Sequence, residues 1–185
     1  MSDSQAPQAP AGAQAGPAVP GPASAVLPTA GGAAPAAAPA PETPKLPNPL
    51  AHVPLPFVGV DYNLKGFHAD ATVAPEQIVA AAKAMDEEGF ALDTITGVDW
   101  LAQGQMEVVY DFFHPLKSLR AVVRTRVPRD KPELATICRV FPGANWHERE
   151  AHYFFDIRFL GHPDLSPFLL PEDADYHPLR KDFVA

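Results

Sequence analysis

Two histidines and a glutamate near residue 150 are the first side chains in this sequence whose types could bind a metal ion. His147 and Glu148 are followed by His152, which is close to the spacing of helical zinc sites, where two histidines four residues apart share one helix face. Here the histidines are five residues apart and point about 140° apart around a helix. One zinc ion therefore cannot bind both, and we predict no zinc site here.

A second group of acidic residues and histidines follows nearer the C-terminus. Its members are His162, Asp164, Glu172, Asp173, Asp175 and His177. Such side chains build acid–base and metal sites, but here they lie in a proline-rich stretch with no rigid element to position them. We expect His162, which precedes Pro163, to orient a turn by hydrogen bonding. A free-standing metal-dependent enzyme that uses His162, Asp164 and His177 stays open as an alternative.

Glu148 and Glu150 are a third candidate, a catalytic pair of carboxylates. On a helix they diverge by about 200°, which suits ion pairs on two different surfaces better than joint catalysis. Arg149 between them can bind a carboxylate through two parallel hydrogen bonds, a contact that fixes interfaces. The adjacent glycines Gly31 and Gly32 have no strand before them, and no nucleophile–base motif is recognisable. We therefore expect no catalytic, cofactor-binding or metal-binding residue.

The elements that position these residues follow from the apolar periodicity. An amphipathic helix is predicted to begin at Pro75 and to end at Gly89, which can adopt a left-handed conformation. Strands are predicted over 90–96, with a continuation to 99, and over 106–113. A third strand is predicted over 119–127, where the odd-numbered residues form one face. The short connection between the last two strands predicts an antiparallel hairpin.

The rest of the C-terminal half is less regular. Arg120, Arg124 and Arg126 lie on the other face of the third strand, as a solvated face or, alternatively, a docking stripe. Residues 128–132 are predicted to form a loop, and 134–140 are too short to assign. Asn145 is predicted to cap a short helix. Together these elements predict an α/β (α+β) fold with a small sheet of about three or more strands, partly antiparallel, packed with helices.

Composition divides the chain into three parts. Residues 1–49 are mostly Ala, Pro, Gly and Gln, with Asp3, Glu42 and Lys45 as the only charges. This part is predicted to be a disordered tail with polyproline II character, because it buries too little apolar surface to offset chain entropy. It lacks the pattern of a secretory signal. Residues 50–160 are predicted to form the α/β domain, and residues 161–185 an extended arm for partner docking.

Charge, cysteine content and hydropathy exclude several classes of function. The net charge of −8 argues against nucleic acid as a partner. Cys138, the single cysteine, supports neither a disulfide framework nor an iron–sulfur cluster. No apolar run reaches about 18 residues, so we expect contact with a membrane only through partners. A proline-rich adaptor that acts through residues 1–49 is a further alternative, and a solvated tether is the favoured interpretation of that tail.

Three ordered blocks near the C-terminus combine charged, aromatic and turn residues. They are Ala144-Asn145-Trp146 with Glu148-Arg149-Glu150, then Gly161-His162-Pro163, then Pro178-Leu179-Arg180-Lys181-Asp182-Phe183. In this order they resemble the 30 kDa subunit family of the proton-pumping NADH:quinone oxidoreductase, which is respiratory complex I. The resemblance extends upstream to Gly97-Val98-Asp99 and covers about residues 75–183. Where that family usually has an aspartate and a glycine after Glu-Arg-Glu, this chain has Tyr153 and Asp156.

The resemblance implies a non-catalytic subunit in the peripheral arm of a complex that transfers electrons from NADH to quinone. It would lie on the cytoplasmic side of the membrane, bound to the large quinone-site subunit and to neighbouring iron–sulfur subunits. NADH, FMN, iron–sulfur clusters and quinone would bind to those partners and not to this chain. The equivalent subunit of a membrane-bound energy-converting [NiFe] hydrogenase, with the NiFe centre on a partner, stays open as the main alternative.

The resemblance also implies which residues contact partners. Arg149, Arg180 and Lys181 would pair with partner carboxylates, and Glu148 and Glu150 with partner cations. Aromatic side chains would fill apolar pockets, since interfaces concentrate binding energy in such residues and in arginine. The expected interface residues are Trp146, Glu148, Arg149, Glu150, Gly161, His162, Pro163, Arg180, Lys181, Asp182 and Phe183.

Overall fold

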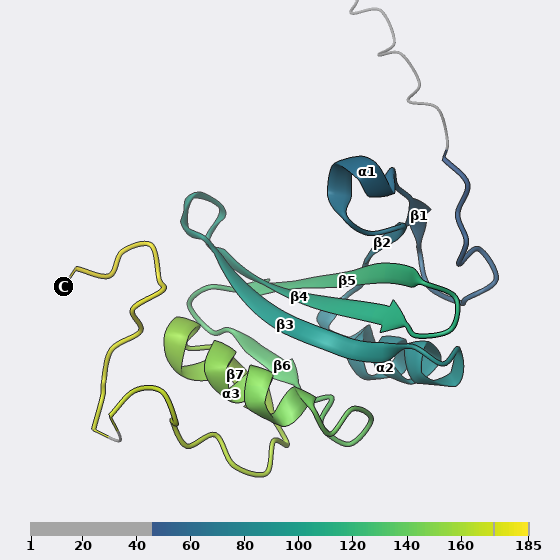
Figure 1. The fold of residues 1–185 in the computed structure, drawn as a ribbon. Helices are drawn as coiled ribbons and strands as arrows, with labels where there is room; N and C mark the ends of the chain where they lie inside the picture. Colours follow the sequence, from purple (N-terminus) through teal and green to yellow (C-terminus); the bar gives the residue numbers. More distant parts are fainter. Residues whose placement is uncertain (1–45, 172, 185) are drawn as a thin grey trace, which may run out of the picture. The chain divides into compact units, whose positions relative to one another are not determined.

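A five-stranded mixed sheet is the centre of the fold in the computed structural model, which describes residues 46–171 and 173–184 (Figure 1). Its strands are β1 (Val58–Gly59), β2 (Ala69–Thr72), β3 (Ala91–Trp100), β4 (Gln105–His114) and β5 (Leu119–Pro128), in the order β1-β2-β5-β4-β3. Strands β2 and β5 are parallel, and the other neighbouring pairs are antiparallel. The predicted fold class is confirmed, whereas the predicted tail lies almost wholly outside the described residues.

Helices and a second, two-stranded sheet complete the domain. The helices are α1 (Tyr62–Lys65), α2 (Ile78–Glu87) and α3 (Ala144–Phe155), with short 3-10 turns over Pro75–Gln77 and Leu101–Gln103. Strands β6 (Glu133–Ala135) and β7 (Arg158–Leu160) pair in parallel. None of the helices in the described part of the chain is long and apolar enough to cross a bilayer.

The predicted helix and three long strands are confirmed. The 3-10 turn that begins at Pro75 leads into α2, and Gly89 ends the helical segment with φ +80°. Strands β4 and β5 form the expected antiparallel hairpin, with Tyr110 opposite Val123. The prediction for Asn145 is wrong. Helix α3 already begins at Ala144, so Asn145 lies in its first turn, and no side chain caps this end.

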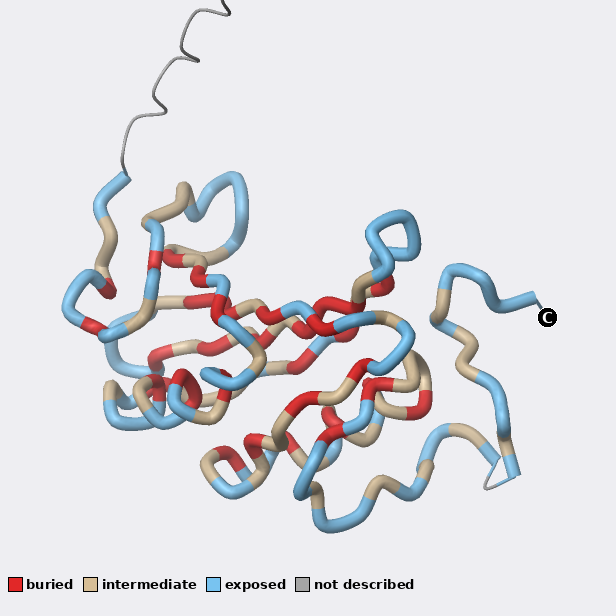
Figure 2. The backbone as a smooth tube through the Cα atoms, turned by 180° about the vertical axis from the view of Figure 1, so that it is seen from behind, coloured by how far each residue is buried: buried red, intermediate tan, exposed pale blue. Residues whose placement is uncertain are grey.

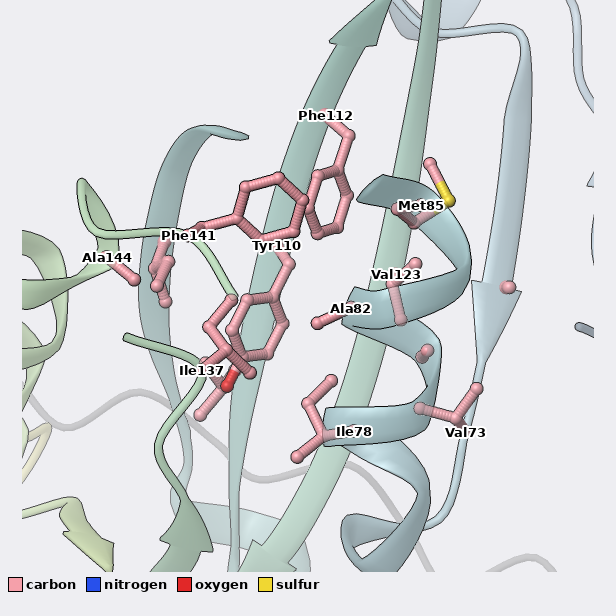
Figure 3. Packing of buried hydrophobic residues seen from close by; sticks show 14 of the residues in the cluster. Val73, Ile78, Ala82, Met85, Tyr110, Phe112, Val123, Ile137, Phe141 and Ala144 are labelled. Atoms are coloured by element: carbon pink, nitrogen blue, oxygen red, sulfur yellow. The ribbon is translucent and has the colours of Figure 1, made fainter. Parts of the chain in front are cut away.

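The hydrophobic core lies between one face of the sheet and α2 (Figure 3). Ile78, Ala82 and Met85 of the helix pack against even-numbered residues of β4, such as Tyr110 and Phe112. The loop after β6 completes the core with Ile137 and Phe141, and the Phe141 ring centroid lies 5.4 Å from that of Phe112. Because successive strand residues point to opposite faces, the odd-numbered residues of β4 lie on the other face of the sheet.

Ion pairs cover that second face of the sheet. Arg120 pairs with Asp93 and Asp111, Arg124 lies 2.9 Å from Asp70, and Arg126 lies 2.9 Å from Glu107. The arginine face predicted from the sequence is therefore present. Its guanidinium groups are neutralised within the chain, which removes the main reason to expect a docking stripe there.

A glycine fixes how α3 packs on the exposed edge of the large sheet. A Cβ atom at Gly97 of β3 would lie 2.6 Å from Cδ2 of Phe155 in α3, which is far inside van der Waals contact. The absence of a side chain at this position therefore lets α3 lie directly on β3. Helix α3 carries the first of the three sequence blocks, so this contact positions the candidate site.

Candidate functional site

The Glu-Arg-Glu block of α3 begins with a carboxylate that points into the domain. Glu148 has 0% exposure and accepts hydrogen bonds from the Ile137 amide at 2.8 Å, the Thr136 hydroxyl at 2.5 Å and the Cys138 thiol at 3.2 Å. Burial raises the pKa of Glu148 above its ordinary value. The expectation that Glu148 pairs with a partner cation is therefore corrected: its carboxylate fastens the loop after β6 to α3.

Glu148 also belongs to the one group of three metal-ligand types that come together within the described residues. The donor atoms of Cys138, Glu148 and His162 all lie within 4.8 Å of one another. However, Nδ1 of His162 accepts a hydrogen bond from the Asp164 amide at 3.1 Å, so Nε2 carries the ring proton and faces the Asn145 carbonyl oxygen at 3.3 Å. Both ring nitrogens are thus in use, and the group is arranged as a hydrogen-bonded hub.

The hub has two further consequences. The predicted role of His162 as the residue that orients a turn is confirmed, because its ring connects the first turn of α3 to the chain after β7. Gly161, with φ +81°, turns the chain into this position. Burial also raises the pKa of the Cys138 thiol to about 11, and the thiol is therefore protonated at neutral pH.

The residues of the metal-dependent alternative are not gathered into one site. Asp164 accepts a hydrogen bond from the Ser166 amide at 2.8 Å beside His162. His177 lies instead at the other end of α3, where its Nδ1 is 2.8 Å from the Tyr153 carbonyl oxygen. Asp173 and Asp175 are exposed, and Glu172 lies outside the described residues.

Arg149 fastens the beginning of the C-terminal segment to α3. Its Nε donates to the Ser166 carbonyl oxygen at 2.8 Å, and its Nη2 donates to the Ser166 hydroxyl at 3.2 Å. The guanidinium lies 4.9 Å from the ring centroid of Trp146 and 5.0 Å from that of Phe168. These donors are used within the chain, so the guanidinium is not presented as a free bidentate ligand for a partner carboxylate.

The end of α3 is bound to the later part of the same segment. The amide of Leu179 donates to the Phe154 carbonyl oxygen at 3.2 Å. Since a carbonyl oxygen only accepts, His177 donates from Nδ1 to the Tyr153 carbonyl oxygen. Two of the helix's last carbonyl groups, which have no partner within a helix, are thus satisfied by the arm.

Asp156 follows α3 in a left-handed conformation, with φ +65°. A glycine adopts this conformation without a steric cost, and aspartate is among the few other residues that visit it routinely. Its carboxylate lies 3.1 Å from Arg180 and 3.6 Å from Nε2 of His177. Aspartate here therefore adds a charged attachment for the arm. Tyr153, the other departure from the family pattern, is buried and packs edge-on against Phe168, so it is not on a contact face.

The last sequence block is held by a second buried carboxylate. The Asp99 side chain is fully buried, and its oxygens accept from Arg129 at 2.8 and 3.0 Å and from the Lys181 amide at 2.8 Å. The hydrogen bonds from Arg129 lower the pKa of Asp99. Arg129 also donates to Asp182 at 2.5 Å. The expectation that Arg180 pairs with a partner carboxylate is thus corrected, since its carboxylate partner is Asp156.

What remains exposed is a set of apolar and polar side chains along the arm. None of the described residues after Leu160 is buried (Figure 2). Exposed large apolar residues of this surface are Trp146 at 56%, Phe168 at 39%, Leu169 at 59%, Tyr176 at 41%, and also Leu179, Phe183 and Val184. Glu150, Pro163 and Lys181 are exposed too. Of the residues predicted to contact partners, these with Trp146 and Phe183 are the ones that are still free to do so.

Comparison with known sequences identifies relatives of this domain. Residues 71–185 match the protein family described as respiratory-chain NADH dehydrogenase, 30 Kd subunit. The matching subunit of the NADH-quinone oxidoreductase of Xanthobacter autotrophicus is 36% identical over 140 residues, or 72% of this chain and 66% of that protein. The subunit of the same name in Roseiflexus castenholzii is 37% identical over 115 residues, or 60% and 66% of the two chains.

Two further similarities come from other respiratory complexes. A subunit of the F(420)H(2) dehydrogenase of Methanosarcina mazei is 38% identical over 96 residues, covering 50% of this chain and 59% of that protein. A subunit in the structure of an archaeal membrane-bound sulfane sulfur reductase has a TM-score of 0.63 at 28% identity, covering 73% and 81% of the two chains. The chain spans roughly two fifths to two thirds of the length of the curated relatives that it matches.

Proposed function

Because the chain belongs to the 30 kDa subunit family of respiratory-chain NADH dehydrogenase, we propose that it is a non-catalytic subunit in the peripheral arm of a complex I-like NADH:quinone oxidoreductase. It docks on the large subunit that forms the quinone site and supports electron transfer from NADH to quinone. NADH, FMN, iron–sulfur clusters and quinone bind to the other subunits. The chain lies on the cytoplasmic side of the membrane and is held there through its partners.

One observation carries this proposal. The described residues after β7 form an arm without helix or strand, which is held along α3 by side-chain hydrogen bonds and ion pairs and still exposes large apolar side chains. Exposed apolar side chains grouped on one surface are characteristic of protein-binding sites. The specific sequence blocks give the arm its path, and the exposed side chains supply the contact. We accordingly treat 50–160 as the folded domain, 161–185 as the docking arm and 1–49 as a tether.

A second candidate function differs only in the complex. The Methanosarcina mazei relative is named for F(420)H(2) dehydrogenase, and the structural neighbour belongs to a sulfane sulfur reductase. The same docking subunit would serve a related membrane-bound complex with another electron donor or acceptor. An energy-converting [NiFe] hydrogenase is the member of this class that we keep as the alternative.

Purification of the tagged full-length chain from gently solubilised membranes of its source cell tests both candidates. Mass spectrometry of the co-purified subunits is the measurement. NADH-binding and iron–sulfur subunits support complex I, and a nickel–iron large subunit supports the hydrogenase. Repeated recovery of the chain alone contradicts the docking role. Deletion of residues 1–45 is the matched control, because recovery of the same partners separates the tether from a proline-rich adaptor.

A further inference from the structure

The middle of the arm is a loop that is held at both of its ends. Arg149 and Tyr153 bind the chain at Ser166 and Phe168. His177 and Leu179 bind it again at the end of α3. We call the residues between these attachments, 169–176, the tethered loop. Since the ends are fixed, ordering the loop on a partner costs less conformational entropy than ordering a free chain terminus.

The tethered loop exposes apolar and acidic side chains side by side. Leu169 and Tyr176 are exposed at its two ends, and Asp173 and Asp175 are exposed between them. Among the described residues, neither aspartate takes part in an ion pair. The sequence has no lysine or arginine between Arg158 and Arg180. This surface therefore has one sign of charge, unlike the paired charges on the open face of the sheet.

The contrast with the rest of the arm identifies the loop as the part that is free to bind. Arg149, Arg180 and Asp182 are all engaged within the chain. Within the described residues, the loop forms one backbone hydrogen bond of its own, from the Ala174 amide to the Pro171 carbonyl oxygen at 3.1 Å. Tyr176 is supported from behind by Phe183, with ring centroids 5.8 Å apart.

We propose that the tethered loop inserts its apolar side chains into a groove on a partner protein that is rimmed by lysine or arginine side chains. This inference rests on the proposed function and adds the chemistry of the partner surface. The aspartates at the rim orient the loop and accelerate association, while Leu169 and Tyr176 supply the buried contact. A membrane is the less suitable occupant, because anionic headgroups repel the aspartates.

Matched charge reversals test this proposal in the full-length chain. The double variant Asp173→Lys with Asp175→Lys alters the loop, and Asp86→Lys with Glu87→Lys makes the same change in charge on the exposed side of α2. We measure the amount of partner subunits recovered with each tagged chain at several salt concentrations. The loop variant is expected to lower recovery by roughly tenfold at physiological salt, and the α2 variant to leave it unchanged. Leu169→Ser should lower recovery at every salt concentration.

The possible results separate this inference from the proposed function. If the wild-type chain recovers partners and the loop variant recovers as many, the inference is wrong and the docking role stands. Equal losses in both double variants indicate a general effect of charge and also contradict the inference. Binding of the wild-type chain to protein-free vesicles of anionic phospholipid as tightly as to its complex would replace the partner protein by a membrane. A wild-type chain that recovers no subunit contradicts the docking role itself.

Discussion

The two ends of the arm are fastened by different chemistry. The first end depends on neutral hydrogen bonds and on stacking: His162 and Glu148 form the hub, and Arg149 lies between aromatic rings. The second end depends on ion pairs, in which Arg129 joins Asp99 to Asp182. Both ends contain a fully buried carboxylate, but burial raises the pKa of Glu148, whereas hydrogen bonds from Arg129 lower that of Asp99. The ends should therefore respond differently to charge, pH and salt.

The largest expected effect comes from removing the cation of the second end. Arg129→Met leaves the buried Asp99 carboxylate with the Lys181 amide as its remaining donor, which is expected to cost about 2–3 kcal/mol of folding free energy. Residues 177–184 should exchange their amide hydrogens faster, while 162–168 keep the wild-type rate. Hydrogen exchange with mass spectrometry measures both. Equal acceleration at the two ends would show that they are not separate fasteners.

Opposite pH dependence should distinguish the two buried carboxylates. The folded pKa of Asp99 is lowered from 3.8, so its stabilisation is present above that pH and is lost as the pH falls below it. The folded pKa of Glu148 is raised from 4.5, so ionisation of Glu148 reduces stability as the pH rises above that value. Asp99→Asn should therefore be most destabilising near neutral pH, and Glu148→Gln most destabilising in acid.

Urea denaturation of wild type and both variants between about pH 3 and pH 7.5 measures this difference. The free-energy gap between wild type and Asp99→Asn is expected to widen as the pH rises, and the gap for Glu148→Gln to narrow. Gaps that run in parallel with pH would contradict the contrast. Both substitutions replace a carboxylate by an amide of the same shape, so each serves as the steric control for the other.

A smaller effect is expected at Asp156, where conformation and charge can be separated. Asp156→Asn keeps a residue that tolerates a positive φ but removes the ion pair with Arg180, at a cost of about 0.5 kcal/mol because the pair is partly exposed. Asp156→Gly removes the same charge and relieves the backbone. The glycine variant should therefore be the more stable of the two by thermal denaturation, with equally fast exchange of the arm in both. A less stable glycine variant would mean that the backbone is not the limiting factor here.

The smallest change is chemical and concerns the first end. Because the pKa of Cys138 is raised from 9.0 to about 11, its thiolate fraction near pH 8 is lower by about a hundredfold than that of an ordinary thiol. Alkylation by iodoacetamide should be slower by at least that factor in the folded chain than in urea. Glu148→Ala opens the hub and should restore part of the rate. A folded chain that reacts as fast as the unfolded one contradicts a closed hub.

The long elements were predictable from the sequence because their patterns are long. The ten-residue strands β4 and β5 alternate strictly, and α2 has proline at its beginning and glycine after its end. Strands β1, β2, β6 and β7 have two to four residues each, too few for a period to be recognised. Their pairing depends on tertiary contacts, such as the parallel register of β2 on β5.

The candidate site was only partly predictable, for a related reason. The sequence blocks identified the important residues, but a residue type does not say whether its partner lies in the same chain. Glu148 and Cys138 are ten positions apart and meet across a turn, while Asp99 and Lys181 are 82 positions apart. The helical spacing did predict that Glu148 and Glu150 face different surfaces, and Glu148 is buried whereas Glu150 is exposed.

The position of β2 has a practical consequence for work with fragments. The family match begins at residue 71, in the middle of Ala69–Thr72, and β1 lies entirely upstream of it. A fragment trimmed to that match would lose β1 and half of the strand that pairs with residues 121–124 of β5. The backbone groups of β5 would then form an open, apolar sheet edge, which is a template for self-association. Fragments that begin before Leu46 keep this edge covered and should remain monodisperse.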